Sequence, residues 1–285
     1  MTSINEFESV FKSAAKTVFR PDAISITNVS IVIDSSFESV PDFVERVEKF
    51  LQVLNTDENK IKINRISGDQ YSDDRQLVEL IEQQQAELVC TYRNLHSGPN
   101  LYPYSLGEYV DVLTQAIQTP ILLIPRPEET EHWHLINSDR VMIMTDHLSG
   151  DSQIVMYGAL FTQADGELTL AHVEDLQTFE RYMEIIGKIR SIDSEVARGE
   201  IMDQLLKEPR DFVLSCEKGL QEANYPIKVN SIVTAGKHLF DYKNLIKEHE
   251  TDLLVLHTKD DDQLAMHGLA YPVSVELRDI PLLLI

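Results

Sequence analysis

The sequence predicts an α/β protein composed of two tandem, doubly wound parallel-sheet domains. Short stretches rich in Ile, Val and Leu alternate with stretches in which apolar residues recur at spacings of three and four, as in amphipathic helices. Such alternation is typical of right-handed crossovers that place helices on both faces of a parallel sheet. The chain also matches itself: Thr119–Ile124 reads TPILLI and Ile280–Ile285 reads IPLLLI, and Gly107 and Gly268 precede these segments by the same interval.

The first series of elements ends near residue 127. Ile and Val dominate its first strand, as in strands buried on both faces, and Asp73 is of a residue type that caps helices. In order, we expect a helix over Ile4–Phe19, a strand over Ile24–Asp34, a helix over Val40–Leu54, a strand over Lys60–Ser67, a helix from Asp73 through Gln85, a strand over Glu87–Tyr92, a helix near Leu106–Gln118 and a strand over Thr119–Ile124.

The second series follows a stretch without periodicity, Pro125–Asp139, which resembles an interdomain linker. We therefore expect domains over residues 1–127 and 140–285, joined by a linker over 128–139. The second domain is expected to contain, in order, a strand over Val141–Thr145, a helix over Asp151–Gln163, a strand over Glu167–Val173, a helical region from Leu176 to Asn224 broken near Gly199 and Pro209, a strand over Ile227–Thr234, a helix over Leu239–Glu250, a strand over Asp252–His257, a helix over Leu264–Leu277 and a strand over Ile280–Ile285.

The two series differ at their starts, because the first has no counterpart of the strand Val141–Thr145. The first domain is thus expected to lack its first strand. Another segment could fill the gap, the helices could shift over it, or the domain could be a four-stranded version. Asp34 ends the strand Ile24–Asp34, which corresponds to the second strand of the second series, and Asp175 follows that second strand itself. We expect both residues to cap the helices that follow.

Composition narrows the class of protein. The formal charge of −22 would repel the phosphates of nucleic acid and anionic lipid, and no apolar run is long enough to cross a bilayer. The N-terminus lacks the pattern of a secretory signal, so we expect a cytoplasmic protein that binds neither nucleic acid nor membrane. Cys90 and Cys216, outside any CxxC pair, are expected to be buried and reduced.

Several motifs together resemble the universal stress protein family, whose fold is adenine nucleotide alpha hydrolase-like. They are VMIMTD at Val141–Asp146, ELTLAHVED at Glu167–Asp175, TDLLVLHT at Thr251–Thr258, and the two segments TPILLI and IPLLLI. The resemblance implies a five-stranded parallel sheet in each domain and an intramolecular pseudo-dimer of the two repeats.

The resemblance also implies where a nucleotide would lie. Many relatives bind ATP through an Asp after the first strand and a glycine-rich loop after the fourth, and Asp146 and Gly268 match these positions. His257 and Thr258 begin the corresponding loop, which continues with carboxylates instead of glycines. Asp260 and Asp262, with His257, could hold a divalent cation or could simply form a solvated acidic loop.

These departures favour a regulatory or scaffold protein that acts by binding a protein partner or a small ligand, without ordinary ATP binding and without catalysis. The alternative is an ATP- or AMP-binding stress protein with slow ATP hydrolysis. There Asp146 orients the nucleoside, and Mg²⁺ bridges phosphate to Asp260 or Asp262. A third possibility is a purely structural pseudo-dimer.

Overall fold

The computed structural model describes residues 18–35, 41–55, 60–97, 104–126, 137–144, 151–258, 266 and 268–285. The helix expected over Ile4–Phe19 lies almost entirely outside these residues. The first group of elements is β1 (Asn28–Val32), α2 (Pro41–Phe50), the 3₁₀ helix η1 (Leu51–Leu54), β2 (Lys62–Ile66), α3 (Asp74–Gln83), β3 (Leu88–Thr91), α4 (Glu108–Ala116) and β4 (Ile121–Leu123).

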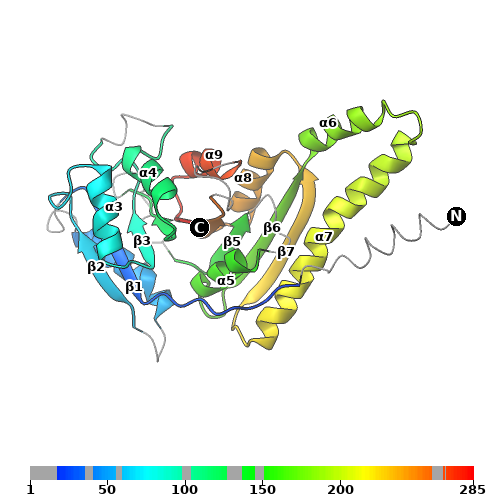
Figure 1. Cartoon of the computed structure of the whole chain (residues 1–285). Helices are drawn as coiled ribbons and strands as arrows, with labels where there is room; N and C mark the ends of the chain where they lie inside the picture. The colour runs from blue at the N-terminus through cyan, green and yellow to red at the C-terminus, as the bar shows by residue number, and fades with distance from the viewer. Residues whose placement is uncertain are drawn as a thin grey trace.

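The second group begins at Arg140 and extends to the C-terminus. It comprises β5 (Arg140–Met144), α5 (Ser152–Phe161), β6 (Glu167–Asp175), α6 (Leu176–Ile186), α7 (Ser194–Glu222), β7 (Lys228–Gly236), α8 (His238–Glu248), β8 (Leu253–Leu256), α9 (Ala270–Glu276) and β9 (Leu282–Leu284). The predicted α/β class and the alternation of strands and helices are confirmed (Figure 1).

All the described strands belong to one sheet, in the order β2-β1-β3-β4-β9-β8-β5-β6-β7. Every neighbouring pair is parallel except β4 and β9, which run antiparallel with Leu122 opposite Leu283. This pairing makes the two groups of strands continuous. The domain boundaries 1–127 and 140–285 stay a prediction, and most of the linker 128–139 lies outside the described residues.

The first group contains four strands, because β1 pairs directly with β3. Val29 lies opposite Leu88 and Ile31 opposite Cys90, which leaves no place between them for a strand equivalent to β5. In the second group β5 occupies that central place, between β8 and β6. Of the three possibilities that the sequence left open, the described residues thus contain the four-stranded version.

The region between β6 and β7 corrects the predicted helix breaks. Gly199 and Pro209 both lie inside α7, which is continuous over 29 residues. The interruption falls instead at residues 187–193, where Gly187 ends α6 and the Asp193 side chain accepts hydrogen bonds from the Glu195 and Val196 N–H groups at the start of α7. The cap at Asp193 therefore marks the start of α7, whereas Gly199 and Pro209 do not interrupt this helix.

Residues 18–27 form a strap that connects α7 with the start of β1, along the lower side of the molecule in Figure 1. Phe19 is buried and meets Phe212 of α7 edge to face, with ring centroids 6.5 Å apart. The Phe19 N–H donates to the Ser215 hydroxyl at 3.1 Å. The strap thus connects the second group with the strand that opens the first. Cys90 and Cys216 are buried free thiols, as predicted.

Candidate functional site

The carboxyl ends of parallel strands are where doubly wound sheets bind ligands, so the predicted site residues were expected there. His257 and Thr258 directly follow β8, and Gly268 lies two residues before α9. Asp146, Asp260 and Asp262 lie outside the described residues. Of the predicted site residues, the structure describes His257, Thr258 and Gly268.

Thr258 is hydrogen-bonded to Ile285, which follows β9. Its N–H and its hydroxyl each donate to the carbonyl oxygen of Ile285 at 2.8 Å, and only 4% of the residue is exposed. The hydroxyl thus extends the pairing of β8 with β9. Thr258 has a structural role here, and a phosphate would have to displace this bond to use the hydroxyl.

His257 lies against the start of α5. Its Nε2 is 3.7 Å from Oδ2 of Asp151, and both side chains are partly exposed. Asp151 also caps α5 by accepting a hydrogen bond from the Ile154 N–H at 3.0 Å. The structure therefore brings His257 to a carboxylate at the carboxyl end of β5, close in sequence to the predicted Asp146.

Gly268 and Gly107 adopt left-handed backbone conformations, with φ of +55° and +92°. Gly107 is the N-cap of α4, and Gly268 precedes the N-cap of α9. A Cβ on Gly107 would lie 2.7 Å from the Cα of Asn94, which no side chain tolerates. The loop preceding α4 thus requires glycine at this position for steric reasons alone.

In the first group, the corresponding end of the sheet is filled by Arg126. Its Nη1 donates to the carbonyl oxygens of Arg93, Asn94 and Ser97 at 3.0–3.3 Å, and its Nη2 lies 3.3 Å from Oδ2 of Asp34. Only 11% of the Arg126 side chain is exposed. The segment after β3 is therefore held by hydrogen bonds to a largely buried guanidinium.

Asp34 accepts hydrogen bonds from three directions. The Tyr92 hydroxyl donates to Oδ1 at 2.5 Å, and the His96 N–H and Arg126 contact Oδ2. Arg126 also lies over the Tyr92 ring, 5.0 Å from its centroid. Burial, and then the hydrogen bond to Asp34, raises the pKa of Tyr92, so its hydroxyl stays a donor.

The expected capping role of Asp34 stays a prediction, because residues 36–40, which follow it, lie outside the described part of the chain. Its carboxylate is committed to partners that are 58 to 92 residues distant in the sequence. Asp175, by contrast, caps α6 as predicted, accepting from the Gln177 N–H at 3.0 Å and the Thr178 hydroxyl at 2.7 Å. Sequence reasoning missed Arg126; the available signal was a lone cation two residues after a wholly apolar strand.

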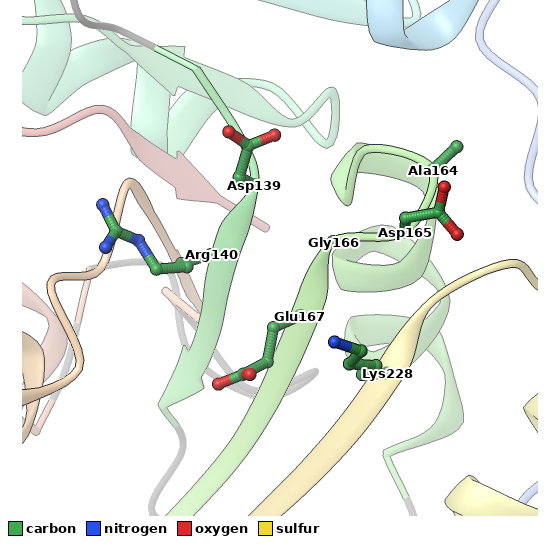
Figure 2. A pocket seen from close by; sticks show the side chains of 7 residues that line it. All are labelled: Asp139, Arg140, Ala164, Asp165, Gly166, Glu167 and Lys228. Atoms are coloured by element: carbon green, nitrogen blue, oxygen red, sulfur yellow. The ribbon is translucent and has the colours of Figure 1, made fainter.

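A separate shallow cavity of about 380 Å³ lies at the opposite, amino end of β5, β6 and β7 (Figure 2). It is lined by Asp139, Arg140, Ala164, Asp165, Gly166, Glu167 and Lys228. Arg140 is engaged by Asp252 at 3.1 Å and by Glu250, and the hydrogen bond to Asp252 raises its pKa. The cavity is distinct from the predicted site and carries three carboxylates.

Two properties of the described residues bear on the predicted ligands and partners. No group of three or more His, Cys, Asp or Glu side chains among them is arranged to hold a metal ion. The metal candidates Asp260 and Asp262 lie outside the described residues. Within the described part of the chain, no helix has the length and apolarity needed to cross a membrane.

Comparison with known proteins gives matches in structure alone. No family model matches the chain, and no curated protein matches it in sequence. A protein of unknown function from Pseudomonas aeruginosa PAO1 aligns with 91% of this chain and 92% of its own, at 9% identity and a TM-score of 0.49. A universal stress protein from Archaeoglobus fulgidus aligns with 91% of this chain and 85% of its own, at 11% identity and a TM-score of 0.45.

Proposed function

We propose that this chain is a universal-stress-like regulatory or scaffold protein, which acts by binding a protein partner or small ligand and does not bind ATP in the ordinary way. The observation that carries the proposal is the position of Arg126. Its guanidinium and the Asp34 carboxylate occupy the carboxyl end of the first group of strands, where a nucleotide would otherwise be sought.

The second group supports the proposal through Thr258 and the loop that follows. The Thr258 hydroxyl is engaged by the Ile285 carbonyl. The sequence then continues with three carboxylates, Asp260 to Asp262, where backbone N–H groups of glycines would have to approach a phosphate. Carboxylates repel a triphosphate unless a cation bridges them.

A second candidate function is cation-assisted binding of ATP or AMP with slow hydrolysis. It is favoured by the left-handed conformation of Gly268 before α9 and by the position of His257 beside Asp151. In this candidate Asp146 would orient the nucleoside, and Mg²⁺ would bridge phosphate to Asp260 or Asp262.

A thermal-shift titration with ATP, ADP and AMP, each with and without Mg²⁺ or Mn²⁺, separates the two functions. A ligand that binds only the folded state at 100 times its Kd adds about 2.7 kcal/mol of stability, which is readily detected. We expect no shift at millimolar nucleotide. A saturable, Mg²⁺-dependent shift that Asp146→Asn abolishes and Asp165→Asn, at the other end of β5–β7, preserves would establish the second candidate instead.

A further inference from the structure

The two edges of the sheet differ in length and in charge. β2, at one edge, has five residues, of which Lys62 and Arg65 are charged. β7, at the other, has nine residues, and only its first, Lys228, is charged. Natural sheets protect their edges with short strands, prolines or charges, because an exposed edge pairs readily with another strand. β2 has this protection, whereas the segment Val229–Gly236 contains neither a proline nor a charged residue.

The outer side of β7 presents backbone groups to a potential partner. β6 pairs with β7 along all nine residues, and the Lys228 N–H donates toward β6 at the Gly166 carbonyl oxygen, 2.8 Å away. Successive N–H groups of a strand point to opposite sides, so those of Val229, Ser231 and Val233 point away from β6. No strand among the described residues pairs with that side.

An apolar projection lies at the same edge. We call α6, residues 187–193 and the first turns of α7 the α6–α7 arm; Figure 1 shows it extending beyond β7 at the upper right. It exposes six large apolar side chains, with exposed fractions of 37–60%, namely Leu176, Tyr182, Ile185, Ile189, Ile192 and Val196. Clustered exposed apolar residues on a soluble surface mark interaction sites.

The tip of the arm is basic. Between Ile185 and Ile192 the chain carries Lys188 and Arg190 and no acidic residue, although its net charge is −22. Glu184 and Asp193 flank this stretch, and the Asp193 carboxylate is engaged in capping α7. The cavity at the amino ends of β5, β6 and β7 is lined by three carboxylates, those of Asp139, Asp165 and Glu167, and by two cations, Arg140 and Lys228. Arg140 is already paired with Asp252 and Glu250, so acidic groups are in excess there. The tip and the cavity are at opposite ends of β6 and β7, so they cannot meet within one molecule.

We propose that the β7 edge is the docking surface for a second copy of this chain, with β7 antiparallel to the partner's β7 across a two-fold axis. Antiparallel pairing places the carboxyl end of β7 beside the amino end of its partner strand. The basic tip of the α6–α7 arm, which leaves from the carboxyl end of β6, then adjoins the acidic cavity of the second copy. A two-fold axis forms this contact twice.

Three features select a second copy over other occupants. Val229–Gly236 can pair with itself without placing like charges opposite each other. The chain already uses antiparallel pairing once, between β4 and β9, which places both of these strands inside the sheet and leaves β2 and β7 as its edges. The net charge of −22 opposes docking on an anionic membrane, whereas the basic tip is complementary to the acidic surface of another copy.

The mass of the full chain in solution tests the docking surface. Sedimentation and light scattering should give twice the chain mass of 32.5 kDa. Ser231→Pro removes an N–H that points away from β6, at an exposed position of an edge strand, where proline is tolerated. It should raise the dimer dissociation constant by roughly 30-fold or more, because each symmetric interface loses two hydrogen bonds.

Ser231→Thr is the matched control, because it keeps the N–H and should leave the dimer intact. Circular dichroism and the melting profile at dilutions where both variants are monomeric should be alike. A wild-type chain that stays monomeric, or a dimer with equal affinity in the Ser231→Pro and Ser231→Thr variants, overturns the proposal.

A charge exchange tests the position of the α6–α7 arm. Lys188→Glu with Arg190→Glu should weaken the dimer by about tenfold at low salt. Adding Asp165→Lys and Glu167→Lys to the same chain should restore most of the lost dimer affinity, since the charges of the tip and of the cavity are then both reversed. Failure of the fourfold variant to recover affinity would rule out the contact between the tip and the cavity.

Discussion

The guanidinium of Arg93 donates two hydrogen bonds to the main-chain carbonyl oxygen of Ser274, from Nε at 3.0 Å and from an Nη at 2.8 Å. The same Nη donates to the Leu277 carbonyl oxygen at 2.5 Å. Arg93 follows β3 and is 1% exposed, whereas Ser274 and Leu277 belong to the last turn of α9 and its C-cap. A cation from the first group thus satisfies carbonyl groups at the end of a helix in the second.

Replacing Arg93 should therefore be costly. Arg93→Met keeps much of the buried aliphatic volume but leaves one buried and one partly buried carbonyl group without their donor, and the expected loss is about 3 kcal/mol in the free energy of unfolding. Urea denaturation measures it. Arg75→Met removes an exposed arginine that pairs with Glu79 within α3, and should change stability by less than about 0.5 kcal/mol. Similar small losses in both variants would contradict the cap.

The sequence predicted the elements that Arg93 connects, but not the contact between Arg93 and α9. The strands were predictable because each is a short apolar run, and β4 and β9 were predictable as a matched pair from TPILLI and IPLLLI. Their antiparallel pairing with each other, and the direct pairing of β1 with β3, depend on which edges meet in space. Periodicity within a strand contains no information on its neighbours.

The left-handed conformation of Gly107 leads to a second prediction. Gly107→Ala would combine a φ of +92° with a Cβ 2.7 Å from the Asn94 Cα and 2.9 Å from its nitrogen. We expect a loss of at least about 2 kcal/mol, because the neighbouring atoms are backbone and cannot rotate away. Equilibrium unfolding in urea measures the loss.

Gly199 provides the opposite case within the same chain. It lies inside α7, and a Cβ there would meet no atom within 4 Å. Gly199→Ala should stabilise the protein by about 0.5–1 kcal/mol, since alanine loses less backbone entropy in a helix. If both alanine variants shifted the unfolding midpoint in the same direction, the steric explanation for Gly107 would be wrong.

A third prediction concerns acid stability. The Glu87 carboxylate accepts hydrogen bonds from the Thr27 N–H at 2.6 Å, the Thr27 hydroxyl at 2.9 Å and the Asn28 N–H at 3.1 Å. The backbone hydrogen bond from Thr27 is the main cause that lowers the pKa of Glu87 below its ordinary value of 4.5. A lowered folded-state pKa contributes stability above the unfolded-state pKa, and this is lost as the pH falls through the folded-state value.

The melting temperature of Glu87→Gln should accordingly fall below that of the wild type by a constant amount near neutral pH. The difference should shrink progressively below about pH 4.5, where the wild-type carboxyl group becomes protonated. Thr27→Val removes one of the three hydrogen bonds and should show the same pH dependence with a smaller amplitude. A difference between wild type and Glu87→Gln that persists unchanged to pH 3 would contradict this assignment.

The parts of the site that sequence reasoning missed have one physical feature in common. Asp34 was expected to bond locally, to the helix that follows it, as Asp175 does. Among the described residues its partners include Tyr92 and Arg126, 58 and 92 residues away, which the sequence did not predict. Local capping is readable because the donor lies two or three residues ahead, whereas a buried ion pair depends on the folded arrangement of three strands.

The ion pair between Asp34 and Arg126 gives the last prediction. Arg126→Met should lower the free energy of unfolding by about 2 kcal/mol, because three carbonyl groups after β3 lose a charged donor. Asp34→Asn should lower it by a similar amount, since the amide replaces one acceptor of the Tyr92 and His96 bonds with a donor. The double variant should lose about 1–2 kcal/mol less than the two singles together.

The exposed pair Arg198–Glu180 serves as the comparison for this cycle. Its two hydrogen bonds of 2.6 Å are better in geometry than the 3.3 Å contact of Arg126 with Asp34, but both side chains are about half exposed. Solvent screening should reduce its coupling to near zero. Equal coupling in the two cycles would mean that burial does not strengthen the Asp34–Arg126 pair. The stabilisation by Arg126 would then come from its hydrogen bonds to the three carbonyl groups after β3, and not from its charge opposite Asp34.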